Sequence, residues 1–283
     1  MVGVDAAQPA VGPDRSQADG GTFIVLTALG ARLGLASLLL LLAGLAWWLT
    51  ARQMVGMSAA PGADLGSIGW FIGIWVVMMA AMMFPSVAPT VALYARMTRR
   101  RGIVQPMIFA GSYLLVWSAV GVAAYFLFAI GRSTIGSYLA WNAGGRWLAA
   151  AIVAVAGVYE LTPLKSVCLA RCRSPLGFLL GRWRDGRRGA LEMGARHAAW
   201  CVGCCWALMA ALFALGVMSL VWMAVVAAVI TAEKSLPWRR PVIWGSAAAL
   251  LMVALLIAVA PRSVPGLVLP GTDSPGTTMQ VMR

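Results

Sequence analysis

The stretch His197-Ala-Ala-Trp-Cys201-Val-Gly-Cys204-Cys205-Trp-Ala-Leu-Met209 opens a long apolar run near residues 196–217. An apolar run of this length predicts a helix that is buried or crosses a membrane. Successive helical residues turn by about 100°, so His197, Cys201 and Cys204 fall within roughly 60° of one another, with Cys205 beside them. The stretch therefore predicts a helix that presents sulfur and imidazole side chains on one face.

The rest of the chain is as apolar as this run. Of its 283 residues, 61% are hydrophobic and 11% are charged, and the mean hydropathy is +0.84. Soluble domains are about 45–50% apolar and about 25% charged. We therefore predict an all-α fold, a polytopic transmembrane helical bundle in the inner or plasma membrane, with the lipid bilayer as its first partner. The net charge of +13 requires no nucleic acid, because basic residues collect in cytoplasmic loops.

The apolar segments predict about seven spans, or six if the fifth and sixth are one. They lie at about 30–50, 68–94, 106–131, 146–165, 196–217, 219–233 and 241–260. A polar, arginine-rich loop is expected between the fourth and fifth spans, to about residue 195. Pro85 and Pro89 are expected to break or kink the second span near its cytoplasmic end, because proline cannot donate a helical hydrogen bond.

Basic residues give the chain an orientation. Most of the 22 lysines and arginines lie in alternate loops, at 95–105, 165–196 and 234–240. This bias predicts a cytoplasmic N-terminus and, with seven spans, a C-terminus outside. We expect one transmembrane domain over 21–262, with a metal-binding core at about 70–240, between disordered tails at 1–20 and 263–283.

This topology places all five cysteines and the single histidine at the cytoplasmic face. Cys168 and Cys172 follow the fourth span, and the other three cysteines open the fifth, so the two groups meet if these spans pack together. In a reducing compartment such cysteines are thiols, metal ligands or redox-active groups more often than structural disulfides. Simple packing is the alternative, because free cysteine is commonly buried.

The second span is rich in methionine. Met78 and Met82 are four residues apart and share a helix face, and Met79 and Met83 form a second pair. Thioether sulfur is a soft ligand suited to copper(I). Methionine also fills irregular cores, so packing is the alternative here.

Glu160 lies inside or at the end of the fourth span. A charged side chain at the centre of a span costs at least about 2.5 kcal/mol on insertion scales, so Glu160 should face a partner, a metal or water. Lys165, Lys234 and Arg173 are its candidate partners. Glu233 and Lys234 are expected to form an interfacial pair at the end of the sixth span.

The motifs of the chain resemble those of the predicted metal-binding integral membrane proteins, a bacterial family. The resemblance covers about residues 70–240 and implies metal binding, with ligands at Cys168, Cys172, Cys201, Cys204 and Cys205. The chain differs from the family motif at one position: Glu160 follows Tyr159 where the motif is expected to have a glutamine. The matching motifs are Trp75-x2-Met78-x2-Ala81-Met82-Met83-x-Pro85-Ser86, Tyr159-x2-Thr162-Pro163-Leu164-Lys165-x2-Cys168-Leu169-x2-Cys172-Arg173, Cys201-x-Gly203-Cys204-Cys205-Trp206-x-Leu208-Met209, and Trp222-Met223 followed by Glu233-Lys234.

Three functions remain open. The first is binding of a soft transition metal, copper(I) first and zinc second, for transport or delivery to a membrane or soluble protein partner. The second is thiol–disulfide exchange or electron transfer by Cys201 and Cys204, and the third is a non-catalytic subunit of a membrane complex with packing cysteines. The chain has no P-loop, GxSxG, HExxH or Rossmann motif, which favours a role other than an enzyme. The candidate metal ligands are Cys168, Cys172, Cys201, Cys204, Cys205, His197, Met78, Met82 and Glu160.

Overall fold

The computed structural model describes residues 34–35, 37–53, 66–99, 102–136, 141–181, 183–216, 219–264 and 267. Regular structure in these residues is entirely helical, so the prediction of an all-α fold is confirmed for the described part of the chain. The tails expected at 1–20 and 263–283 lie outside the described residues, apart from 263, 264 and 267. Residues 37–53 are helical, and the later elements are α2 (Ile68–Met97), α3 (Val104–Ile135), η2 (Trp141–Gly145), α4 (Arg146–Glu160), α5 (Pro163–Arg173), α6 (Pro175–Gly181), α7 (Gly186–Gly216), α8 (Leu220–Ser235), α9 (Arg239–Val259) and η3 (Pro261–Ser263).

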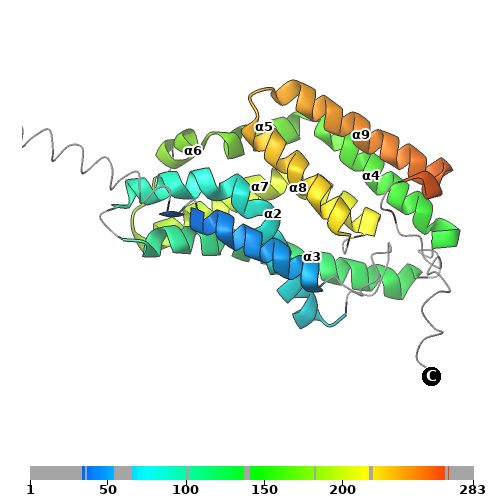
Figure 1. The fold of residues 1–283 in the computed structure, drawn as a ribbon, viewed down its shortest axis with the longest axis horizontal. Coiled ribbons are helices and arrows are strands. Elements are labelled where there is room, and N and C mark those ends of the chain that lie inside the picture. Colours follow the sequence, from blue (N-terminus) through cyan, green and yellow to red (C-terminus); the bar gives the residue numbers. More distant parts are fainter. Residues whose placement is uncertain are drawn as a thin grey trace, which may run out of the picture.

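Helices α2 and α7 form the centre of the bundle. In the most apolar 18-residue segment of each helix, the buried share is 67% in α2 and 61% in α7. The same share is 11% in α3 and 22% in α9. Helix α3 packs along α7, and α9 runs beside α4 at the top of Figure 1. The outer helices therefore present large apolar side chains such as Leu127 and Val259 outward, a pattern typical of a surface that meets lipid.

Four described helices are long and apolar enough to cross a membrane: α2, residues Val104–Thr134 of α3, α7, and residues Arg240–Val259 of α9. Helices α4 and α5 would together make a fifth span, bent by 65° at their junction. Helix α8 has 16 residues, or about 24 Å at 1.5 Å per residue, which is shorter than a hydrocarbon core of about 30 Å. The number of seven spans and the orientation therefore stay predictions.

The segment expected as a polar loop between residues 165 and 196 is largely helical, which corrects the sequence prediction. Helices α5 and α6 occupy its first half, and α7 begins at Gly186. The fourth span also ends earlier than expected, at Glu160. Thr162 then caps α5 by accepting a hydrogen bond from the backbone N–H of Lys165, with Pro163 in the first turn. Arginines on an exposed helix face lower the hydropathy of a segment without breaking its helix, which is why the sequence pattern suggested a loop.

Helix α2 continues through Pro85 and Pro89, so these prolines do not break the second span, while the alternative of a kink stays a prediction. The helix is the most buried of the four candidate spans, and packing on both sides of the prolines holds its two halves together. The Ser86 hydroxyl donates to the carbonyl of Met83 at 2.9 Å, which satisfies one nearby backbone acceptor.

Candidate metal site

The cysteines of α5 and α7 meet at the interface between these helices. The Sγ atoms of Cys172 and Cys204 are 3.8 Å apart. A Cβ atom on Gly203 would lie 2.8 Å from the Sγ of Cys168, so the missing side chain at Gly203 makes room for that sulfur. The structure thus brings the two cysteine groups together, as the sequence predicted.

Three of these sulfurs form a compact group on α7. The Sγ atoms of Cys201, Cys204 and Cys205 all lie within 4.8 Å of one another, and those of Cys201 and Cys205 are 3.9 Å apart. Two sulfurs bound to one ion at about 2.3 Å each lie at most about 4.6 Å apart. The group therefore needs at most a small closure to share one ion. We call Cys168, Cys172, Cys201, Cys204 and Cys205 the sulfur site.

The helix backbone orients the three α7 thiols. Cys204 and Cys205 both donate to the carbonyl oxygen of Cys201, at 3.1 and 2.8 Å. This bonding one turn back along a helix is a common way for a short polar side chain to be satisfied in an apolar surrounding. All five cysteines of the chain are free and buried, which is compatible with metal binding, redox chemistry or packing.

Polar groups from two other helices converge on Cys201. The hydroxyl of Tyr113, on α3, and the Nζ of Lys234, on α8, each lie 3.0 Å from the Cys201 Sγ. Lys234 also donates to the hydroxyl of Ser86 on α2, at 3.3 Å. A positive charge at this position offsets the negative charge that thiolate ligands bring into a buried site.

A second cluster of buried polar side chains lies at the N-terminal end of α5. The Nζ of Lys165 forms ion pairs with Glu160 and with Glu233, the latter at 2.8 Å, and the hydroxyl of Ser246 on α9 lies 3.4 and 3.2 Å from oxygens of the two carboxylates. We call Glu160, Lys165, Glu233 and Ser246 the charge cluster. The predicted pairing of Glu160 with Lys165 is confirmed. The expected interfacial pair of Glu233 with Lys234 is wrong, because these neighbours turn to different sites.

One protein family matches most of the chain. The family model described as "PpoB2: Copper chaperone" matches residues 72–257. The chain belongs to this copper chaperone family. No curated protein and no solved structure matches it. The matched region contains the whole sulfur site and the whole charge cluster, so both lie in the part of the chain that resembles the family.

The donor set of the sulfur site fits the metal in the family's description. Thiolate sulfur is a soft ligand that favours copper(I), although it also binds zinc. The three α7 sulfurs are 0–2% exposed, so an ion there would be shielded from water. The geometry of the site therefore fits copper binding and does not by itself distinguish zinc.

His197 lies in an aromatic surrounding rather than in the three-sulfur group. Its ring packs against Phe109, Tyr113 and Phe178, with ring centroids 6.0, 6.1 and 5.1 Å away. The side chain is buried, and its Nδ1 atom has no hydrogen-bond partner. An unsatisfied buried nitrogen is costly, so this atom is suited to a ligand or a water molecule. Metal binding by His197 stays a prediction.

The methionines of α2 share the core with the sulfur site. Met78, Met79, Met82 and Met83 are each at most 1% exposed and belong to the same buried apolar cluster as the cysteines. Core packing accounts for all four. Thioether ligation by Met78 and Met82 stays a prediction, as does metal binding by Glu160, whose observed partner is Lys165.

Sequence reasoning missed two residues of these sites and assigned the wrong partner to a third. Tyr113 lies in the middle of an apolar helix, 88 residues before Cys201, and Ser246 lies 86 residues after Glu160. Neither belongs to a local motif. Lys234 had a signal, because it stands in the last of the matching motifs, but its partner is Cys201 rather than Glu160 or Glu233.

Proposed function

We propose that this protein is a polytopic membrane protein that holds copper(I) between α5 and α7 and passes it on. Two of the three cysteines Cys201, Cys204 and Cys205 bind the ion as thiolates while the third stays a thiol, and Cys172 is the nearest further sulfur. One observation carries the proposal: three buried sulfur atoms within 4.8 Å of one another, in a chain that belongs to a copper chaperone family.

The charge of the site favours copper(I) over zinc. Copper(I) bound by two thiolates carries one negative charge, and the ammonium of Lys234 beside Cys201 neutralises it. Zinc bound by four thiolates carries two negative charges; here these would come from Cys172, Cys201, Cys204 and Cys205. The ammonium of Lys234 neutralises one of them, so the other stays uncompensated in an apolar interior. Uncompensated buried charge is strongly unfavourable.

The distribution of basic residues supports loading from the cytoplasmic side. Arg171 and Arg173 lie in the last turn of α5, close to Cys168 and Cys172 along the chain. Arginines and lysines are enriched on the cytoplasmic side of membrane proteins. In this arrangement a membrane or soluble protein partner delivers copper(I) to, or receives it from, the end of the bundle that holds the sulfur site.

Metal analysis of the purified protein tests the proposal. We expect about one copper per chain under reducing conditions, retained in competition with a copper(I) chelator, and lost in a Cys201→Ser/Cys204→Ser variant. The same experiment with Met82→Leu measures the thioether contribution. Met252→Leu is its matched control, because Met252 is exposed on α9.

The outcomes separate the competing functions. Zinc retained in place of copper would overturn the choice of metal. A folded protein that binds no metal but forms a reversible Cys201–Cys204 disulfide in redox buffers would support thiol–disulfide exchange instead. A folded protein with neither property would leave the cysteines as packing residues.

A further inference from the structure

The charge cluster contains more negative than positive charge. Glu160 and Glu233 are each 2% exposed, and Lys165 is fully buried. Lys165 is paired with both carboxylates. One ammonium compensates one carboxylate, so a second ionised carboxylate would leave a net negative charge in the interior. Such a charge is costly to bury and calls for a neutralising partner.

The hydrogen bonds of the cluster also leave one acceptor unsatisfied. The Ser246 hydroxyl lies within 3.4 Å of both carboxylates and within 3.0 Å of the carbonyl of Ile243, but its single hydrogen can serve only one acceptor at a time. The Oε1 atom of Glu160 is buried and has no hydrogen-bond partner among the residues that the structure describes. Both the charge and this oxygen favour a carboxyl group that carries a proton.

The other charged groups near the cluster are directed elsewhere. On α5, the guanidinium of Arg173 donates to the backbone carbonyls of Glu233 and Leu236 rather than to a carboxylate. On α8, Lys234 turns to Cys201, the cysteine of α7 that faces this helix, and to Ser86 of α2. Among the described residues, the hydrogen bonds to the two carboxylates come from Lys165 of α5 and Ser246 of α9.

We propose that the charge cluster is a proton-binding site, in which Glu160 or Glu233 carries one proton, and that this site is linked to the sulfur site. A metal cation is a poorer occupant, because the ammonium of Lys165 already lies between the carboxylates. Buried carboxylates in membrane proteins commonly serve as proton carriers.

Each charged member of the cluster has a close chain neighbour that contacts the sulfur site. Tyr159, next to Glu160, donates to the carbonyl of Gly203, the residue against which Cys168 packs. Lys165 precedes Cys168 by three residues on α5. Glu233 precedes Lys234, which contacts Cys201. The linkage rests on the proposed function: a shift of α5 or α8 on metal binding changes the surroundings of both sites, and the effect is reciprocal.

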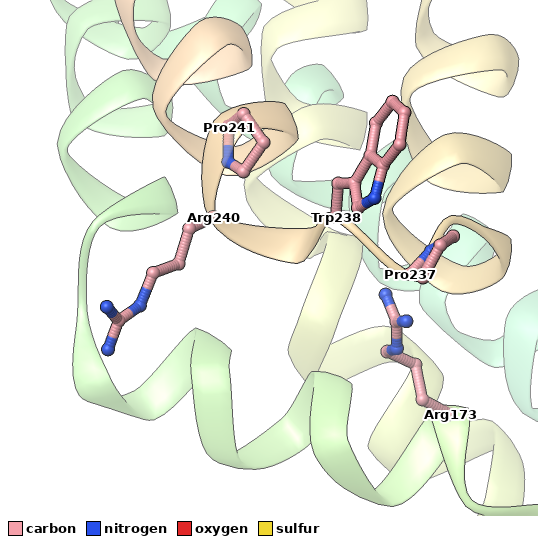
Figure 2. A pocket seen from close by; sticks show the side chains of 5 residues that line it. All are labelled: Arg173, Pro237, Trp238, Arg240 and Pro241. Atoms are coloured by element: carbon pink, nitrogen blue, oxygen red, sulfur yellow. The ribbon is translucent and has the colours of Figure 1, made fainter.

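A surface pocket lies near the charge cluster. It is lined by Arg173 of α5, by Pro237 and Trp238 in the turn between α8 and α9, and by Arg240 and Pro241 in the first turn of α9. Figure 2 shows Arg173 pointing from α5 towards the turn at Pro237, with Arg240 on the other side of the pocket. Because Arg173 also donates to the backbone carbonyl of Glu233, this one side chain lies between the pocket and the backbone that carries the Glu233 carboxylate.

Infrared spectroscopy of the metal-free protein tests the proton site directly. A protonated carboxylic acid has a C=O stretching band that is distinct from those of carboxylates and amides and shifts in deuterium oxide. We expect this band at neutral pH in the wild-type protein. It should vanish in both Glu160→Gln and Glu233→Gln, because each variant leaves one carboxylate for one ammonium. Glu192→Gln is the control, since Glu192 is a partly exposed residue paired with Arg184 and Arg196.

Absence of the band from the wild-type protein at neutral pH would overturn the proton site, as would its persistence in both cluster variants. The linkage is tested by titrating the band against pH with and without bound copper(I), with metal content measured on the same samples. We expect the midpoint to move by about one pH unit, a tenfold change in proton affinity. Bound metal with an unmoved midpoint overturns the linkage alone. Failure to bind metal overturns the proposed function and the linkage, while the metal-free titration still decides the proton site.

Discussion

The sulfur site and the charge cluster are both buried, and both draw residues from α5, yet their chemistry differs. The charge cluster is made of opposite charges that compensate one another, so the removal of one leaves another exposed to an apolar interior. The sulfur site is made of uncharged or singly ionisable thiols, and two of them, Cys204 and Cys205, donate to the helix backbone without a metal. We therefore expect changes in the charge cluster to lower stability, and changes in the sulfur site to lower metal binding.

The sharpest test of this contrast is Lys165→Met. It leaves two buried carboxylates without their ammonium, and we expect the free energy of unfolding to fall by about 3–5 kcal/mol at neutral pH. The loss should shrink as the pH falls, because protonation removes the uncompensated charge. Denaturant unfolding in detergent measures both effects.

Arg196→Gln provides the comparison for Lys165→Met. Arg196 belongs to a partly exposed pair with Glu192 on α7, and exposed pairs contribute about 0–1 kcal/mol. Equal losses in the two variants would show that the charge cluster is no more important to the fold than a surface ion pair.

Gly203→Ala tests the contact between α5 and α7. The new Cβ would lie 2.8 Å from the Cys168 sulfur, so this side chain must move, at a cost of about 1–3 kcal/mol. Copper affinity should fall as well, because α5 is displaced from the α7 sulfurs. Gly73→Ala on α2 is the control, since its Cβ meets nothing within 4 Å. Tight copper binding by the Gly203 variant would exclude α5 from the site.

Lys234→Met separates charge from packing in the sulfur site. Without the ammonium beside Cys201, copper(I) affinity should fall about 10–100-fold, as is typical for residues that support metal ligands. Lys234→Arg keeps the charge and should recover most of this loss. Competition with a copper(I) chelator measures affinity, and an unchanged value for Lys234→Met would remove the charge argument for copper over zinc.

The smallest effect is expected for Tyr113→Phe. This variant deletes the hydroxyl that lies 3.0 Å from the Cys201 sulfur and keeps the ring, so the loss should be about 1 kcal/mol. Calorimetric titration with copper(I) and an unfolding experiment show whether this loss falls on binding or on the fold. A loss of stability with unchanged metal binding would assign Tyr113 to the fold.

The sequence predicted those features that local patterns determine. Apolar segments predicted the helical fold, and the placement of the cysteines around two neighbouring spans predicted that the two cysteine groups would meet if these spans pack together, as Cys172 and Cys204 do. Glu160 was predicted to need a partner, because charge is costly in an apolar segment, and Lys165 was named among the candidates. These inferences need only composition, spacing and the energetics of burial.

Contacts between distant helices could not be predicted in this way. The approach of Tyr113 to Cys201 depends on how α3 is rotated against α7, and the approach of Ser246 to Glu160 depends on how α9 is rotated against α4. No local period encodes such rotations. The directions of Glu233 and Lys234 illustrate the same limit: adjacent residues on a helix point about 100° apart and here reach different sites.

In the proposed function, the burial of the thiols has a consequence for the speed of copper transfer. No residue of the sulfur site is more than 8% exposed, so an incoming ligand would reach the sulfur atoms only after helices of the site, such as α5 and α7, separate. The bend of 65° between α4 and α5 provides a natural hinge for that movement. The residence time of the cargo is then governed by the opening rate of a helix, on the scale of local opening in proteins, rather than by the lifetime of a metal–sulfur bond.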